Sequence, residues 1–161
     1  MLRTEITKLD NQYNLWYMKI QIINGPNLNL TGKREPGHYG TSSFDEFLPI
    51  LKEHFKDIQI DYFQSNVEGL IIDKIQEIGS VCDGIVINAG GYTHTSIAIA
   101  DALTAMKVPA VEVHISNILA REEYRHISFI ANACRGSIMG LGMDSYRLAV
   151  EALRVIVAEQ K

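Results

Sequence analysis

Residues suited to acid–base chemistry follow several apolar runs in this sequence. In the loop after the first run, Arg34 precedes Tyr39 by five residues. A phenol normally loses its proton near about pH 10, and an adjacent cation favours the phenolate. For one loop taken alone, a surface loop with an unrelated Arg and Tyr is the commoner case. A tyrosine base is therefore predicted only because other segments converge with this loop.

Glu112 and His114 lie two residues apart in another apolar run. Alternate side chains of a strand project from the same face, so the two groups are expected to be neighbours. A carboxylate beside an imidazole fixes its tautomer and favours the charged ring that a general acid requires. A parallel strand buried on both faces has little structural need for such a pair. The pair therefore predicts a catalytic acid.

A third apolar run ends at Asn88 and continues through two glycines to His94. Glycines let the backbone approach a ligand, and the Asn88 amide offers both a donor and an acceptor. Thr95 or Ser96 is expected to cap the helix that follows. His94 alone is more often a helix-entry histidine than a ligand. The segment is a candidate binding loop.

Arg121 and Arg125 lie four residues apart and are expected to share one helical face. Two guanidinium groups on one face suit the recognition of a carboxylate. A solvated helix in which Glu122 and Glu123 pair with these arginines is an equally good interpretation. Both remain open at this point.

Apolar runs alternate with helical patterns along the chain. Strands are expected at residues 20–24, 58–64, 84–88, 110–115 and 137–141. Helices are expected at residues 44–55, 68–78, 97–106 and 145–159, with a less regular one at 120–130. Pro49 is expected to kink the first helix or delay its start.

This alternation predicts an α/β fold, a flavodoxin-like three-layer sandwich around a five-stranded parallel sheet of order 2-1-3-4-5. In that order strands one, three and four are neighbours, so their polar carboxyl ends share one edge. That convergence favours an enzyme site. Residues 18–161 are expected to form a single catalytic domain, with residues 1–17 as an N-terminal extension.

Composition narrows the class of protein. The chain has 161 residues, 47% of them apolar, and a net charge of -4 with a pI near 5.7, which argues against nucleic-acid binding. No stretch has the length of a membrane span, so no membrane partner is expected. Cys82 and Cys134 form no C-x-x-C pattern and are expected to be buried thiols in a reducing compartment. We expect a cytoplasmic protein.

Five runs, in matching order and spacing, resemble the type II 3-dehydroquinate dehydratase family over about residues 18–161. They are NGPNL at 24–28, REPGHYG at 34–40, NAGGYTHTS at 88–96, EVHISN at 112–117 and REEYR at 121–125. The resemblance implies the flavodoxin-like fold and a homododecamer, a tetramer of trimers. It implies dehydration of 3-dehydroquinate to 3-dehydroshikimate through an enolate, in the shikimate pathway to chorismate and aromatic amino acids or in quinate breakdown. No metal, cofactor or Schiff base is implied.

The resemblance also implies catalytic roles. Tyr39 is the base, and Arg34 holds it ionised. Asn27 positions a water that stabilises the enolate. His114 protonates the departing hydroxyl, and Glu112 orients His114.

Substrate contacts are implied for a second set of residues. They are Asn88, His94, Ile115, Ser116 and Arg125, with Arg121 in a lid region. Asp101 is implied to enter the site of a neighbouring subunit, which makes the trimer part of the catalytic unit.

Three other classes of protein could in principle share parts of this sequence pattern. A flavodoxin-like module that binds a nucleotide or flavin without catalysis requires a phosphate-binding loop after strand one, where residues 25–32 supply only scattered glycines. A response-regulator receiver requires an Asp where Asn88 stands. A Cys–His hydrolase would have to use Cys82, which precedes strand three at the opposite end of the sheet.

Overall fold

The computed structural model describes residues 18–32 and 43–160. Arg34, Tyr39 and the N-terminal extension lie outside the described residues. Within the described part, no helix is long and apolar enough to cross a membrane.

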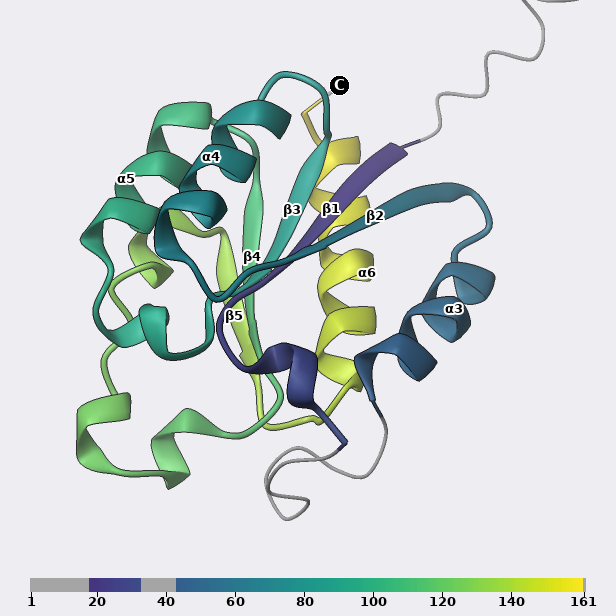
Figure 1. The fold of residues 1–161 in the computed structure, drawn as a ribbon. Coiled ribbons are helices and arrows are strands. Elements are labelled where there is room, and N and C mark those ends of the chain that lie inside the picture. Colours follow the sequence, from purple (N-terminus) through teal and green to yellow (C-terminus); the bar gives the residue numbers. More distant parts are fainter. Residues whose placement is uncertain (1–17, 33–42, 161) are drawn as a thin grey trace, which may run out of the picture.

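A five-stranded parallel sheet of order β2-β1-β3-β4-β5 forms the centre of the molecule, which confirms the predicted topology (Figure 1). The strands are β1 (Met18–Asn24), β2 (Ile58–Gln64), β3 (Gly84–Asn88), β4 (Ala110–His114) and β5 (Gly136–Met139). Asn24 is in register with Asn88, and Ile87 with Glu112, so β1, β3 and β4 end at nearly the same level. Their polar terminal residues therefore meet at one edge, as expected for a site on a parallel sheet.

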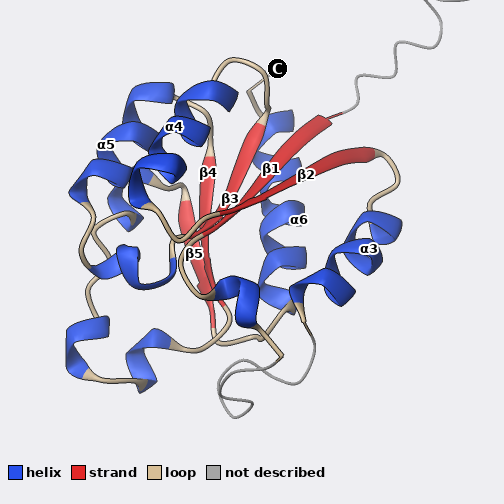
Figure 2. Ribbon diagram, in the orientation of Figure 1, coloured by secondary structure: helices blue, strands red, loops and turns tan. Residues whose placement is uncertain are grey.

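In the part of the chain that the structure describes, four α-helices cover the two faces of the sheet (Figure 2). They are α3 (Phe44–His54), α4 (Glu68–Ile78), α5 (Ile97–Met106) and α6 (Asp144–Ala158). Pro49 lies inside α3, yet the helix is not delayed: a reciprocal capping box between Ser43 and Glu46 fixes its start. Ser96, one of the two predicted caps, accepts a hydrogen bond from the Ile99 amide at the start of α5.

The predicted helix at residues 120–130 is wrong. The segment instead contains the 3-10 turns η3 (Ile118–Ala120) and η4 (Glu123–Arg125), followed by η5 (Ala131–Ala133). The Asn117 side chain accepts from the Leu119 amide, and Ser128 Oγ accepts from the Ala131 amide. Arg121 between the first two turns is extended. Such local side-chain bonds compete with a continuous helix.

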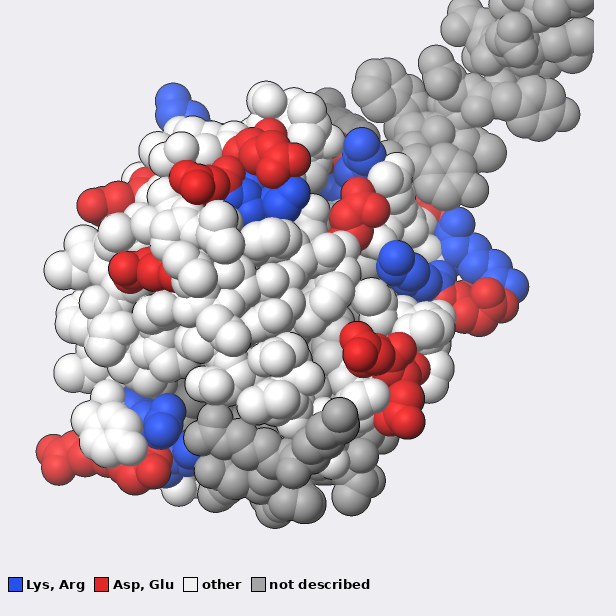
Figure 3. All heavy atoms as spheres, viewed as in Figure 1, with Lys and Arg blue, Asp and Glu red and all other residues white. Residues whose placement is uncertain are grey.

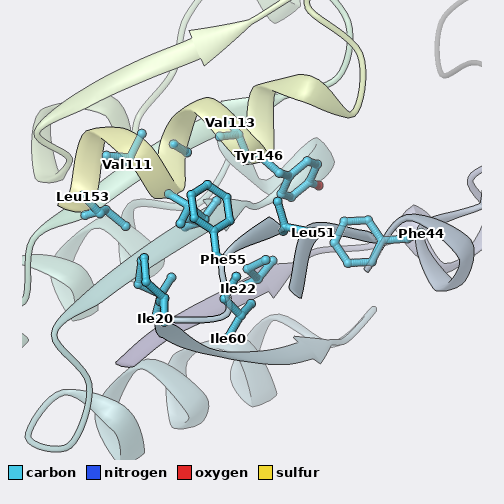
Figure 4. Close-up of a cluster of buried hydrophobic side chains, with 14 of the residues drawn as sticks. Ile20, Ile22, Phe44, Leu51, Phe55, Ile60, Val111, Val113, Tyr146 and Leu153 are labelled. Carbon is cyan, nitrogen blue, oxygen red and sulfur yellow. The ribbon is translucent and has the colours of Figure 1, made fainter. Parts of the chain in front are cut away.

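Two apolar clusters hold the layers together, one on each face of the sheet. The first packs α3 and α6 against alternate residues of the strands and includes Ile22, Phe55, Val113 and Tyr146 (Figure 4). The second packs α4 and α5 against the opposite face. Complete burial of one large apolar side chain such as Phe55 stabilises the fold by about 1.5–3 kcal/mol.

Candidate active site

A cavity of about 240 Å³ lies at the carboxyl ends of β1, β3 and β4. Most of the predicted site residues that the structure describes line it. The lining comprises Pro26, Asn27, Leu28, Leu30, Thr31, Asn88, Gly90, Gly91, His94, His114, Ile115, Ser116, Ile118, Arg121, Glu122 and Arg125. The predicted convergence of three strand ends is thus confirmed.

The loop after β1 fits against the loop after β3 because Gly25 has no side chain. A Cβ atom at Gly25 would lie 2.3 Å from the Ala89 carbonyl oxygen, and the Gly25 amide donates to the Asn88 carbonyl at 2.7 Å. Asn27 follows in a left-handed conformation with φ 66°, and its amide donates to Asn66 Oδ1. This contact brings Asn27 to the wall of the cavity.

Glu112 and His114 form a buried pair at the end of β4. Glu112 Oε1 lies 2.9 Å from His114 Nε2, and the two residues are 0% and 5% exposed. An ionised carboxylate only accepts hydrogen bonds, so Nε2 carries the proton of this contact. His114 Nδ1 is then the ring atom left for exchange with a ligand.

Two serines complete the surroundings of the Glu112 carboxylate. Ser128 Oγ donates to Oε1 at 2.7 Å, and Ser137 Oγ donates to Oε2 at 2.6 Å. Burial alone raises the pKa of Glu112, but the bonds from His114, Ser137 and Ser128 outweigh it and hold that pKa below its usual value. Glu112 is therefore a fixed negative charge behind the imidazole.

His94 is positioned as a neutral acceptor. Its Nδ1 lies 2.7 Å from the Ile127 carbonyl oxygen, so Nδ1 must donate and Nε2 keeps a lone pair. Burial lowers the pKa of His94, and the positive charge of Arg125 adds to this. The rings of His94 and His114 are nearly parallel, with centroids 6.4 Å apart. Two imidazoles, each with one ring nitrogen held by a protein acceptor, therefore line one cavity.

The arginines converge despite the absence of the predicted helix. Arg125 Nε donates to Glu122 Oε2 at 2.9 Å, and Arg121 Nε lies 3.5 Å from the same oxygen. Arg121 Nη1 also contacts Ser116 Oγ at 3.5 Å. A hydrogen bond from its own backbone lowers the pKa of Glu122 to about 2, with Arg125 contributing. Glu122 thus pairs with the arginines, as one of the two interpretations expected, and Arg121 and Arg125 also line the cavity, as the other one requires.

Similarity to known proteins agrees with this geometry. The family model described as Dehydroquinase class II matches residues 18–154. A 3-dehydroquinate dehydratase from Gloeothece citriformis is 52% identical over 136 residues, which cover 83% of this chain and 90% of that protein. One from Fusobacterium nucleatum is 54% identical over 138 residues, which cover 83% and 94%. The chain belongs to the class II dehydroquinase family.

Solved structures of this family superpose on the fold. The crystal structure of a type II dehydroquinase from Butyrivibrio crossotus has a TM-score of 0.84 at 47% identity. The match covers 86% of this chain and 99% of that one. The fold and the family assignment therefore rest on independent comparisons.

Four residues that the dehydroquinase resemblance assigns to the site are not among the residues that line the cavity, and one of them is Glu112, which lies behind His114. Arg34 and Tyr39 lie outside the described residues. Asp101 is exposed on α5 and is not among the lining residues. Its predicted entry into a neighbouring subunit's site stays a prediction.

Sequence reasoning missed Ser128 and Ser137 as supports of this dehydroquinase site. Ser137 pairs with Glu112 across β4 and β5, a relation that only the strand register reveals. Ser128 comes from the segment that was assigned to a helix. In the described part of the chain, no three His, Cys, Asp or Glu side chains are grouped to hold a metal ion.

Proposed function

We propose that this chain dehydrates 3-dehydroquinate to 3-dehydroshikimate, and its curated relatives carry the name 3-dehydroquinate dehydratase. The observation that best supports the proposal is the buried Glu112–His114 pair at a cavity that also presents two guanidinium groups. An acid beside a carboxylate-binding pocket is what loss of water from a hydroxylated keto acid requires. We place the reaction in the shikimate pathway.

In the proposed mechanism Tyr39, ionised beside Arg34, removes a proton from the carbon next to the ketone. The electrons of the C–H bond pass to the carbonyl oxygen, and a water held by Asn27 stabilises the enolate. The enolate collapses, the C–O bond of the neighbouring carbon breaks on the opposite face of the ring, and His114 Nδ1 protonates the departing hydroxyl. Glu112 stabilises the imidazolium before this transfer. The substrate loses one water in total, and the proton that Tyr39 gained must be given up and one returned to His114 before the next turnover.

Substrate binding is proposed for the remaining lining residues. Arg121 lies near Ser116, and Arg121 and Arg125 both offer positive charge to the substrate. His94 Nε2 accepts from a ring hydroxyl, and Asn88 and the backbone beside Ile115 complete the contacts. Glu122 neutralises part of the positive charge of the two arginines, so its carboxylate must move aside when a substrate carboxylate binds them.

We also propose a homododecamer built from trimers in which Asp101 completes a neighbouring site. Ile97 and Asp101 lie four residues apart on α5 and are both exposed, Ile97 by 62%, so they share one outward face. Leu70 on α4 is exposed by 50%. Figure 3 shows charged side chains at the margins of one view with a broad uncharged area between them. Such features suit contact between subunits.

A cytoplasmic location completes the proposal. Cys82 and Cys134 are free thiols, in keeping with a reducing compartment. Burial raises the pKa of Cys82 to about 11 and that of Cys134 to about 12, so neither is an activated nucleophile. A Cys–His hydrolase needs a thiol that ionises readily, so the raised pKa of both thiols argues against that class.

One assay tests the proposal. Purified protein mixed with 3-dehydroquinate should produce the ultraviolet absorbance of the conjugated enone, and His114→Ala should lower the rate by about 10²–10⁴-fold. Wild-type protein that is folded but produces no enone would contradict the proposed reaction. Bound flavin in the visible spectrum would instead favour the alternative of a flavin-binding module.

A further inference from the structure

A completely buried tyrosine hydroxyl joins two asparagines beneath the cavity. Tyr146, on α6, is 0% exposed, and its hydroxyl donates to Asn24 Oδ1 at 2.8 Å. The Tyr146 hydroxyl oxygen also accepts a hydrogen bond from Asn88 Nδ2 at 2.9 Å. Asn24 and Asn88 are register partners at the ends of β1 and β3, and only Asn88 lines the cavity.

Proton counting shows that this contact fixes the orientation of the Asn88 amide. The tyrosine hydroxyl has one proton, which goes to Asn24, so it can only accept from Asn88. The other end of the amide, Asn88 Oδ1, accepts from the Gly90 amide at 3.2 Å. If the Asn88 amide were reversed, its NH₂ group would face the Gly90 N–H, which is also a donor. The single tyrosine proton would then face two amide oxygens, and one of them, on Asn24 or Asn88, would have no donor.

Packing alone does not require this hydroxyl. The Tyr146 ring contacts Phe44 edge-on, with centroids 5.0 Å apart, and Phe47 at 6.0 Å, and it lies within the apolar cluster (Figure 4). A phenylalanine would fill the same space without bringing a polar atom into the core, where an unpaired one is costly. Burial also raises the pKa of Tyr146, so the phenol stays protonated and is no rival for the role of base.

We infer that Tyr146 is a positioning residue: its hydroxyl holds the Asn88 amide so that the second Nδ2 hydrogen and the free Oδ1 lone pair present a fixed pattern to the substrate. The inference rests on the proposed function. Tyr146 touches no reacting atom and acts through Asn88 alone.

The test compares Tyr146→Phe with Asn88→Ala and with the double variant in steady-state kinetics. Loss of the hydroxyl removes one hydrogen bond that orients a binding group, so KM should rise by about 3- to 10-fold while kcat changes less. In the Asn88→Ala background, Tyr146→Phe should cause no further loss of kcat/KM, because the residue through which it acts is gone.

Tyr62→Phe is the matched control. Its hydroxyl lies 3.5 Å from Asn24 Nδ2 and its ring stacks on Phe44 at 4.6 Å, so it shares the cluster but does not contact Asn88. It should keep the wild-type KM.

If Tyr146→Phe fails to fold, Asn24→Ala tests the same link: it frees the hydroxyl proton to turn toward Asn88 and should also raise KM.

Two results would overturn the inference. One is an unchanged KM in folded Tyr146→Phe, or in Asn24→Ala if that variant is the one available. The other is a Tyr146→Phe effect that multiplies with that of Asn88→Ala, which would indicate a general structural effect. Absence of turnover in the wild-type protein would instead contradict the proposed function, so the two failures are distinguishable.

Discussion

At the scale of single residues, the Glu112 carboxylate defines what His114 can do. Because its oxygens receive three donors, Glu112 stays ionised and holds a proton on Nε2 of the imidazole. Glu112→Gln keeps the shape but removes the negative charge on which the proposed role of His114 as an acid depends. We expect kcat to fall by about 10²-fold or more with a smaller change in KM.

Steady-state kinetics of Glu112→Gln at several pH values would measure this effect. Glu123→Gln is the control, since it removes an exposed carboxylate of the neighbouring turn η4. Equal kcat values for Glu112→Gln and the wild type would mean that His114 needs no charged partner.

The proposed base leads to a second expectation at this scale. Tyr39→Phe keeps the ring but removes the ionisable hydroxyl, so turnover should fall by about 10²–10⁴-fold or more. Arg34→Ala should also lower turnover, because the phenolate loses its stabilising cation. Near-normal turnover of Tyr39→Phe, with enone formation followed in the ultraviolet, would end the assignment of the base.

At the scale of elements, the strands and helices were more predictable than the segment from 116 to 133. Buried parallel strands have continuous apolar runs, and the helices have apolar faces, so their bounds could be predicted within a few residues. The 3-10 turns depend on individual bonds of Asn117 and Ser128 to the backbone, which leave no periodic pattern. The Tyr146 link was missed because its ring fits the apolar face of α6 and its partner is 122 residues away.

Strand β5 contributes to the charge of Glu112 through Ser137, which gives a pH-dependent expectation. Ser137→Ala removes a donor, so the folded-state pKa of Glu112 should rise toward its ordinary value. A depressed folded pKa stabilises the fold above the unfolded-state value of about 4.3, and this stabilisation is lost as pH falls through the folded pKa.

The free energy of unfolding should therefore differ between wild type and Ser137→Ala by about 1 kcal/mol near neutral pH, with the difference shrinking as the medium is acidified. Urea unfolding followed by circular dichroism from about pH 7 to about pH 3 would measure it. Ser80→Ala, at an exposed position after α4, is the control. If the difference in free energy of unfolding were the same at every pH, Ser137 would not act through the ionisation of Glu112.

At the scale of the whole molecule, the proposed entry of Asp101 into a neighbouring subunit's site makes assembly part of the proposed function. Asp101→Ala should lower activity without unfolding the subunit, because the residue lies on the outer face of α5. Trimers co-assembled from Asp101→Ala and Tyr39→Phe chains should regain activity. Some of their sites combine the unchanged Tyr39 of an Asp101→Ala chain with the unchanged Asp101 of a Tyr39→Phe chain. A fully active monomer in sedimentation, or no complementation in verified mixed trimers, would rule out the shared site.

The position of β5 at the edge of the sheet has a consequence for heat tolerance. Among the described strands, β5 is the shortest, with four residues, and pairs only with β4, yet its Ser137 supports the carboxylate behind the proposed acid. Segments with few buried apolar contacts open before the core of a fold, and no residue of β5 is fully buried. Activity should therefore decline reversibly, in step with faster hydrogen exchange at the β5 amides, at temperatures that leave the β1–β3 centre protected. The upper working temperature of the enzyme would then be set by the fraying of its shortest strand, below the melting of the domain.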